Sequence, residues 1–410
     1  MSEFSRRQAL AALAAGSATT AASALTGCHS ERSAGADRVD GSSTRGKLDA
    51  NTYEGTANMN TASEPTSAGQ EGVLRVFPLA VGTPWPTVDP FLFCVHHNDK
   101  FPRGNGEFGP AASLSGRRLG MDFSWKDGWN MYHGLSVPGF PAHPHRGFET
   151  VTVVREGLLD HADSLGAAAR YGEGDVQWLT AGSGIQHAEM FPLLKTGEEN
   201  PLDLFQIWLN LPKKSKMVAP YFSMLWAEQI PVLSHRDQAG RETTVEVRAG
   251  QLGTARAPAP PPDSWAADPH NEVAIWSARM TPGAHFELPP AGEGIGRCLY
   301  FFAGSSLKVN GSKLRAPAGA VLQAQSPTQL ENGAEQAQFL VQQGRPIDEP
   351  VAHQGPFVMN TQEELRRAFA DYRSTGFGGW PWPDEAPVHG AEPARFARRE
   401  SGEEERPQSG

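Results

Sequence analysis

Residues 149–154 read Glu-Thr-Val-Thr-Val-Val, and Glu156-Gly157 follows them almost directly. β-branched side chains in alternating positions, closed by a glycine turn, predict a strand with one buried face. The same rhythm recurs along the chain, where short apolar runs are closed by glycine or proline. Further strands are predicted at residues 175–179, 185–191, 204–211, 245–247, 273–280, 299–302, 307–309, 320–322 and 339–341. The pattern therefore predicts an all-β fold of many short strands.

The composition of the 410 residues agrees with a strand-rich fold. Glycine and proline number 44 and 33, about 19% of the chain against an average of roughly 12%, which disfavours a helical bundle. The formal net charge of -10 argues against a nucleic-acid partner, because phosphate binding needs a clustered basic surface. Three cysteines are too few for a disulfide scaffold. We expect Cys94 and Cys298 to be buried thiols, although a disulfide between them stays open.

Residues 1–28 are predicted to be an export signal. Ser5-Arg6-Arg7 resembles a twin-arginine signal, and Leu25-Thr26-Gly27-Cys28 resembles a bacterial lipobox. Processing there would leave Cys28 lipidated, so we expect an exported, periplasmic or cell-envelope lipoprotein that contacts the membrane only through this anchor. An ordinary signal cleaved after Ala22-Ser23-Ala24 is the alternative.

The rest of the chain divides into four segments. Residues 29–72 hold almost no large apolar side chain, so we expect a disordered tether. Two rounds of strands follow, in residues 73–218 and 219–373, and predict two small barrels or sandwiches in tandem. Near the end of the second round, Thr361 and Glu364 predict the capping box of a helix that ends before Gly376. Residues 374–410 are proline-rich and then densely charged, and are expected to form a flexible tail.

Four ligand-type residues stand at strand spacing in the first round. His143 and His145 are two residues apart, as are His187 and Glu189, so each pair would project from one face of an extended strand. If the two strands are neighbours, three imidazoles and a carboxylate meet at one point. Such a set suits a first-row divalent metal and leaves coordination positions vacant. The competing interpretation is that these are ordinary core or surface residues.

The remaining histidines are assigned no metal. His96, His97 and His161 are interpreted as non-ligands, because none has a partner at strand spacing. His133 is either a pocket residue or a structural one. In the second round, His285 belongs to a fragment of a similar pair but lacks a later histidine, so it is expected to lie at the surface or to serve packing.

The sequence motifs resemble those of the pirin family. The resemblance extends from Asp89 to Tyr372 and covers nearly all of the predicted structured chain. It is carried by HPHRGFETVT at 143–152, GDVQW at 174–178, TAGSGI at 180–185, FQIWLNLP at 205–212, EPV at 349–351 and GPFVMNT at 355–361.

The resemblance implies two tandem cupin domains of jelly-roll-like antiparallel strands with a C-terminal helix. It implies one metal ion in the N-terminal cupin, with His143, His145, His187 and Glu189 as ligands and iron(II) as the favoured ion. Copper, manganese, nickel, cobalt and zinc are the alternatives.

Two functions follow from this resemblance. One is a quercetin 2,3-dioxygenase-like oxidoreductase acting on a small aromatic substrate with O2, in which Glu189 is both a ligand and the general base. The alternative is a non-catalytic metal-binding regulator of an unidentified protein. The export signal disagrees with a role in transcription, which some family members have. Metal storage in the envelope is disfavoured because there is a single site.

Overall fold

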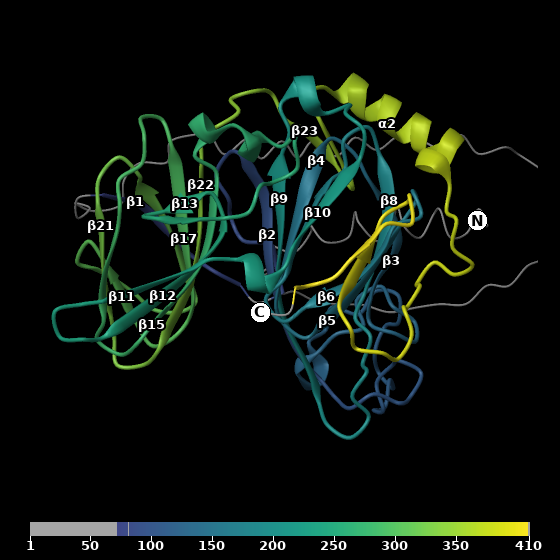
Figure 1. Ribbon diagram of the computed structural model, residues 1–410, viewed down its shortest axis with the longest axis horizontal. Coiled ribbons are helices and arrows are strands. Elements are labelled where there is room, and N and C mark those ends of the chain that lie inside the picture. The colour runs from purple at the N-terminus through teal and green to yellow at the C-terminus, as the bar shows by residue number, and fades with distance from the viewer. Residues whose placement is uncertain (1–71, 81, 409–410) are drawn as a thin grey trace, which may run out of the picture.

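The computed structural model describes residues 72–80 and 82–408. The predicted signal and nearly all of the predicted tether therefore lie outside the described residues. The described chain forms two domains, each a pair of facing antiparallel sheets of the cupin type (Figure 1). This confirms the predicted all-β fold with two tandem cupins. No helix in these ranges is long and apolar enough to cross a membrane.

Most strands belong to one of the two domains. The first domain contains β2 (Phe91–Phe101), β3 (Gly139–His145), β4 (Phe148–Glu156), β5 (Leu158–Asp163), β6 (Ala168–Gly172), β7 (Val176–Thr180), β8 (Ile185–Met190), β9 (Asn200–Asn210), β10 (Tyr221–Leu225), β25 (Phe396–Arg398) and β26 (Glu404–Glu405). The second contains β1 (Val73–Pro78), β11 (Val232–Arg236), β12 (Glu242–Ala249), β13 (Gln251–Leu252), β14 (Ala255–Arg256), β15 (Ala274–Met280), β16 (His285–Leu288), β17 (Gly296–Ala303), β18 (Leu307–Val309), β19 (Ser312–Leu314), β20 (Ala318–Gln323), β21 (Thr328–Asn332) and β22 (Ala337–Gly344).

A hairpin and one α-helix follow the second domain. They are β23 (Ala352–Gln354), β24 (Phe357–Met359) and α2 (Gln362–Thr375). The predicted capping box is present, with Thr361 and Glu364 bonded reciprocally, and Gly376 ends the helix at a φ of 57°. Single 3-10 turns are η2 (Lys126–Gly128), η3 (Lys213–Ser215), η4 (Ala227–Gln229), η5 (Trp265–Ala267), η6 (Pro269–Asn271) and η7 (Gly376–Gly378).

The four main sheets stack as layers. In the first domain the six-stranded sheet β26-β25-β6-β5-β8-β3 faces the five-stranded sheet β10-β7-β4-β9-β2. In the second, the seven-stranded sheet β1-β20-β17-β22-β15-β12-β11 faces β16-β21-β18-β19. A third apolar cluster joins the five-stranded and seven-stranded sheets, so the two domains share a core between them.

This shared core explains why the five-stranded sheet is buried on both faces. Val151 and Val153 of β4 pack toward the second domain, whereas Val154 belongs to the interior of the first. The predicted period-two pattern is correct, but the polar residues Glu149, Thr150 and Thr152 of β4 are buried as well. Cys94 and Cys298 lie in the shared core as free, buried thiols, as predicted.

The domain borders differ from the predicted ones at two strands. β1 pairs with β20 and thus completes the sheet of the second domain. β10 pairs with β7 in the first domain, although it follows the predicted border at residue 218. Strand pairing is a contact between distant segments, so a break in composition cannot locate it.

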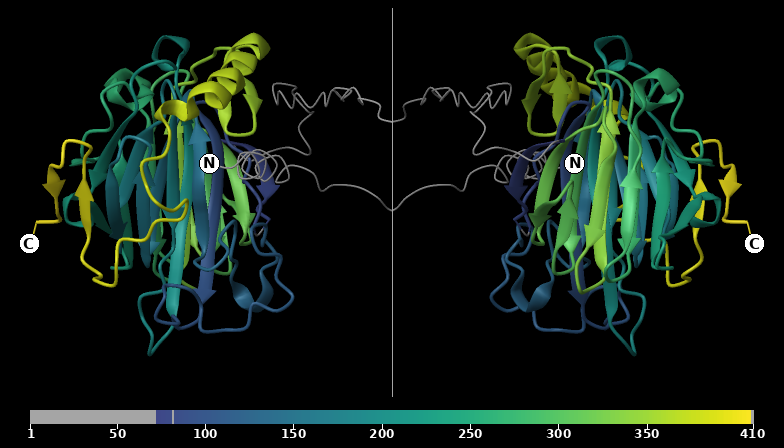
Figure 2. Two further views of the ribbon diagram at one scale, coloured as in Figure 1. Left: turned by 90° about the vertical axis from the view of Figure 1, so that its right-hand side faces the viewer. Right: turned by 90° about the vertical axis from the view of Figure 1, so that its left-hand side faces the viewer.

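The prediction of a flexible tail over residues 374–410 is wrong for the described part, 374–408. After α2 the chain runs back along the outer side of the first domain (Figure 2). There β25 pairs with β6, which would otherwise be an edge strand, and Ala397 is fully buried. Backbone groups make many of these contacts, so side-chain composition did not reveal them.

Candidate metal centre

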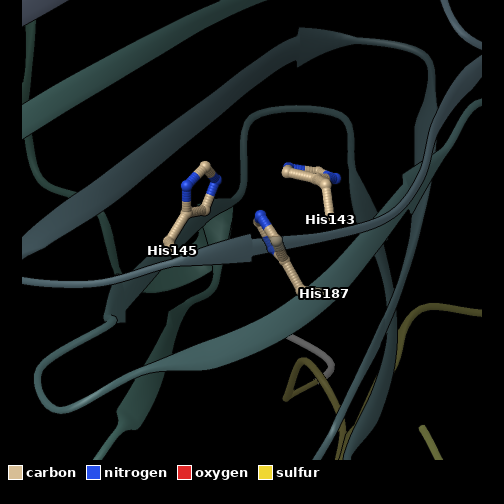
Figure 3. Close-up of side chains that lie close together, drawn as sticks. All are labelled: His143, His145 and His187. Carbon is tan, nitrogen blue, oxygen red and sulfur yellow. The ribbon is translucent and has the colours of Figure 1, made fainter. Parts of the chain in front are cut away.

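Strands β3 and β8 lie next to each other in the six-stranded sheet and bring the predicted ligands together. They pair antiparallel, with His143 directly opposite His187. His145 follows two residues after His143, so the three imidazoles project from one face. Their ligand nitrogens lie within 4.8 Å of one another (Figure 3). The structure therefore brings together three of the four predicted ligands.

The surroundings of the three histidines keep imidazole neutral. Burial lowers the pKa of His143 to about 4 and holds the pKa of His145 and His187 well below the ordinary value, because removal from water disfavours the charged form. Within the described chain, both ring nitrogens of His187 and Nδ1 of His145 lack a hydrogen-bond partner. Buried polar atoms rarely lack a hydrogen-bond partner. Neutral imidazoles with unused nitrogens fit a first-row divalent metal ion.

A backbone contact fixes the orientation of His143. Its Nδ1 lies 2.9 Å from the carbonyl oxygen of Pro141. A neutral imidazole that donates from Nδ1 leaves Nε2 free as the ligand atom, as metal-binding histidines commonly do. The pairing of β3 with β8 shifts register between Phe140 and His143, and such irregularities often re-aim a side chain beside a functional site.

Glu189 lies beside the three histidines without joining their tight cluster. Its Oε2 is 3.7 Å from Nε2 of His187. Gln206 donates from Nε2 to both carboxylate oxygens, at 3.3 and 3.1 Å, and the Thr152 hydroxyl lies 3.1 Å from Oε1. Burial raises the pKa of Glu189, and these hydrogen bonds oppose that shift. The carboxylate is thus held at the edge of the site, and its role as a ligand stays a prediction.

Aromatic rings enclose the cluster. Phe148 and Trp208 contact His145, with ring centroids 5.0 and 5.4 Å away. The ring of Phe140, which is half-buried, lies 6.3 Å from that of His143. His143 is itself the one half-buried member of the three. The site therefore has aromatic walls, and His143 is the most exposed of its three histidines.

Among the histidines predicted to be non-ligands, His161 lies closest to the site. It is buried on β5 directly opposite Glu189, and its ring centroid is 5.6 Å from that of His187. The spacing of histidines along the sequence could not reveal this proximity, because it results from the pairing of β5 with β8. The other predicted non-ligands have partners elsewhere: His96 contacts Asp203, and His97 contacts the Tyr132 hydroxyl.

The two histidines whose roles were left open have structural positions. The ring of His133 is hydrogen-bonded to the carbonyl oxygen of Gly120 at 2.8 Å. His285 is exposed on β16, in line with the predicted surface position. Neither belongs to the cluster formed by the three ligand-type histidines.

The chain after the second domain returns to cover the turn that follows His145 at the end of β3. Arg146, next to His145, forms an ion pair with Asp371 of α2 at 2.7 Å. At Gly147 a Cβ would lie 2.0 Å from the Val358 carbonyl oxygen, and the φ of 85° also favours glycine. Lys216 is buried and donates from Nζ to the carbonyls of Gly147 and Val358, at 2.8 and 3.3 Å. The turn at Arg146 and Gly147 is thus held in place by a segment more than 200 residues away.

Sequence reasoning did not identify Thr152, Gln206 or this brace. The two polar residues stand at inward positions of apolar strands, and such positions are a weak signal of a buried polar group. The brace depends on backbone carbonyls, which leave no mark on the sequence.

Comparison with known proteins gives the family. Residues 82–209 match the family described as Pirin, and residues 275–378 match the Pirin C-terminal cupin domain. The chain is 36% identical over 240 residues to a protein of Pseudomonas aeruginosa named "Putative quercetin 2,3-dioxygenase", covering 58% of this chain and 79% of that protein. Over 258 residues it is 35% identical to human pirin, covering 60% of this chain and 80% of pirin.

A solved structure agrees with these matches. The crystal structure of quercetin 2,3-dioxygenase from Acinetobacter baumannii superposes with a TM-score of 0.58 at 26% sequence identity. The alignment covers 75% of this chain and 98% of that one. With both cupin domains matched, the chain belongs to the pirin family.

Proposed function

We propose that the protein is a metal-dependent dioxygenase that acts with O2 on a flavonol such as quercetin or on a related enolic aromatic compound. The observation that carries this proposal is the cluster of three neutral imidazoles, with unused nitrogens, behind aromatic walls. His143, His145 and His187 would hold the ion, with Glu189 as a fourth ligand and iron(II) favoured. A divalent metal there would supply Lewis acidity toward a substrate hydroxyl and a binding position for dioxygen. The names of two relatives support the substrate class.

The chain's own residues have separate tasks in this proposal. Glu189 accepts the proton of the substrate hydroxyl, since a buried carboxylate with a raised pKa is a better base than an exposed one. Phe140 and Trp208 offer apolar surfaces to an aromatic ring and exclude water, as the walls of small-molecule sites do. Because His143 is half-buried, the substrate approaches the metal from the side of this residue.

The test is quercetin consumption by protein loaded with iron(II) or copper(II) in air. Loss of the quercetin absorption band should match oxygen uptake, and both should disappear in His143→Ala and His187→Ala. His270→Ala, which changes an exposed histidine, should behave as wild type. Full metal occupancy without consumption of quercetin or of related enolic flavonols would contradict the dioxygenase proposal.

A non-catalytic regulator is the second candidate, and one contact favours it. The ion pair between Arg146 and Asp371 links the turn next to His145 to the solvent-facing side of helix α2. A change at the metal would then alter a surface that a protein partner can contact. Under this alternative the protein binds metal stoichiometrically and shows no turnover, whereas Asp371→Asn weakens partner binding at unchanged occupancy.

We further propose that the protein is an exported lipoprotein of the cell envelope, anchored at Cys28. Support comes from the paired arginines at positions 6 and 7 and from the residues that precede Cys28. Cell fractionation should find the protein in the membrane fraction, and Cys28→Ser should release it from that fraction. Recovery of wild-type protein from the cytoplasm with an intact N-terminus would refute this localisation.

A further inference from the structure

Two polar residues face the metal centre from the opposite sheet of the first domain. Thr152 of β4 and Gln206 of β9 are paired directly across their strands. Their neighbours Val151, Phe205 and Ile207 point the other way, into the core shared by the two domains. Because strand side chains alternate between faces, Thr152 and Gln206 project into the first cupin, toward β8.

Both side chains contact the carboxylate of Glu189. Gln206 Nε2 donates to Oε2 at 3.1 Å and to Oε1 at 3.3 Å, and the Thr152 hydroxyl lies 3.1 Å from Oε1. The Thr152 hydroxyl has a single proton to donate, and its shorter contact, at 2.5 Å, is with Oε1 of Gln206. This contact keeps the amide group turned so that its nitrogen faces the carboxylate.

The contacts leave Glu189 little freedom. A carboxylate with both oxygens bound to donors from the facing sheet cannot swing away from the histidines without losing these hydrogen bonds. In the observed orientation Oε2 is the oxygen nearest to His187, at 3.7 Å. The strand β8 provides Glu189, but β4 and β9 determine where its oxygen atoms lie.

We propose that Thr152 and Gln206 are positioning residues that aim Glu189 at the metal. The inference rests on the metal site of the proposed function. It adds two residues of the facing sheet that hold the Glu189 carboxylate in place, called the carboxylate holder below. Without the holder, the ion would keep three imidazoles and lose an ordered fourth ligand. Partners of this kind, behind a ligand, typically change metal affinity by about 10–100-fold.

The experiment uses cobalt(II) as the probe, because its visible absorption reports the number of ligands. Purified full-length protein is titrated with cobalt(II) in competition with a chelator. We expect Gln206→Leu to weaken binding by about 10–100-fold and to change the cobalt spectrum in the same way as Glu189→Gln. The double variant with both Gln206→Leu and Glu189→Gln should bind cobalt(II) no more weakly than Glu189→Gln alone, because Gln206 acts through Glu189. Additive losses, or affinity within about twofold of wild type, would overturn the proposal.

Thr152 gives an independent test that keeps the shape of the site. Thr152→Val removes the hydroxyl and should weaken cobalt binding, whereas Thr152→Ser restores the hydroxyl and should recover the wild-type spectrum. Equal behaviour of the two variants would contradict a role for the hydroxyl. If Gln206→Leu does not fold, this pair decides the proposal. Gln342→Leu, a buried change in the second cupin, is the matched control and should leave cobalt binding unaltered.

The same titration separates failure of this inference from failure of the metal site. If His143→Ala abolishes cobalt binding while the Thr152 and Gln206 variants bind as wild type, only the positioning role is lost. If His143→Ala also binds normally, the metal centre itself is refuted.

Discussion

One buried ion pair of the first domain also binds the tail, and breaking it should cost several kcal/mol. Arg170 of β6 and Asp160 of β5 are both fully buried and form two contacts, Nε to Oδ1 at 2.6 Å and Nη2 to Oδ2 at 2.7 Å. Arg170 also donates to the carbonyl oxygens of Gly390 and Glu392 in the tail. The backbone amide of His389 donates to Asp160 at 2.8 Å.

Arg170→Met keeps much of the side-chain volume and removes the charge. Asp160 would then be a buried carboxylate with the His389 amide as its remaining hydrogen-bond donor among the described residues. Removing one partner of a buried pair typically costs about 3–5 kcal/mol, and natural domains have a total stability of about 5–15 kcal/mol. We therefore expect the variant to lose a large fraction of the free energy of unfolding of the first domain.

Urea unfolding followed by tryptophan fluorescence measures this cost, with the free energy taken from the midpoint and slope. Limited proteolysis should also cut the variant after about residue 380, because the tail loses two anchors. Adding Asp160→Leu should restore part of the stability, since a buried pair replaced by apolar residues is often tolerated. Arg367→Met, at an exposed pair, should cost less than about 1 kcal/mol. A cost below about 1 kcal/mol for Arg170→Met, or a double variant no better than the single one, would refute the reasoning.

Three other predictions concern buried polar groups. Burial raises the pKa of Glu149 to about 7, so the folded state binds its proton more tightly than the unfolded state. The contribution of this proton to stability is complete below about pH 4.5, and about 3 kcal/mol of it is lost as the pH rises to about 7. Glu149→Gln should make the free energy of unfolding less dependent on pH in this range, and an unchanged slope would contradict the prediction. Lys216→Met leaves the carbonyl oxygens of Gly147 and Val358 without their donor, and should cost about 2–4 kcal/mol in urea unfolding; the exposed Lys195→Met should cost less than about 0.5 kcal/mol. Removal of metal with a chelator should lower the melting temperature of wild type, because metal binding is coupled to folding, but should leave that of His187→Ala unaltered; equal shifts in both would argue against the site.

Local pattern was enough for most of the strands and for the helix. The alternation at 149–154 corresponds to β4. Thr361, which forms the capping box with Glu364, is the N-cap of α2, and the helix begins at the next residue. These features are readable because neighbouring residues determine which face of a strand is buried and how a helix begins. The two-residue spacing of His143 and His145, and of His187 and Glu189, likewise placed each pair on one face.

What the chain alone could not decide is which segments meet. The pairing of β1 with the second domain, and of β25 with β6, joins segments far apart in the sequence. The same holds for the reach of Thr152 and Gln206 across the first cupin to Glu189. Local sequence thus determined the elements and the type of site, whereas strand pairing and the facing of two sheets decided how Glu189 is held and what the tail covers. The physical reason is that such contacts depend on the packing of whole sheets, and this is not encoded at any one position.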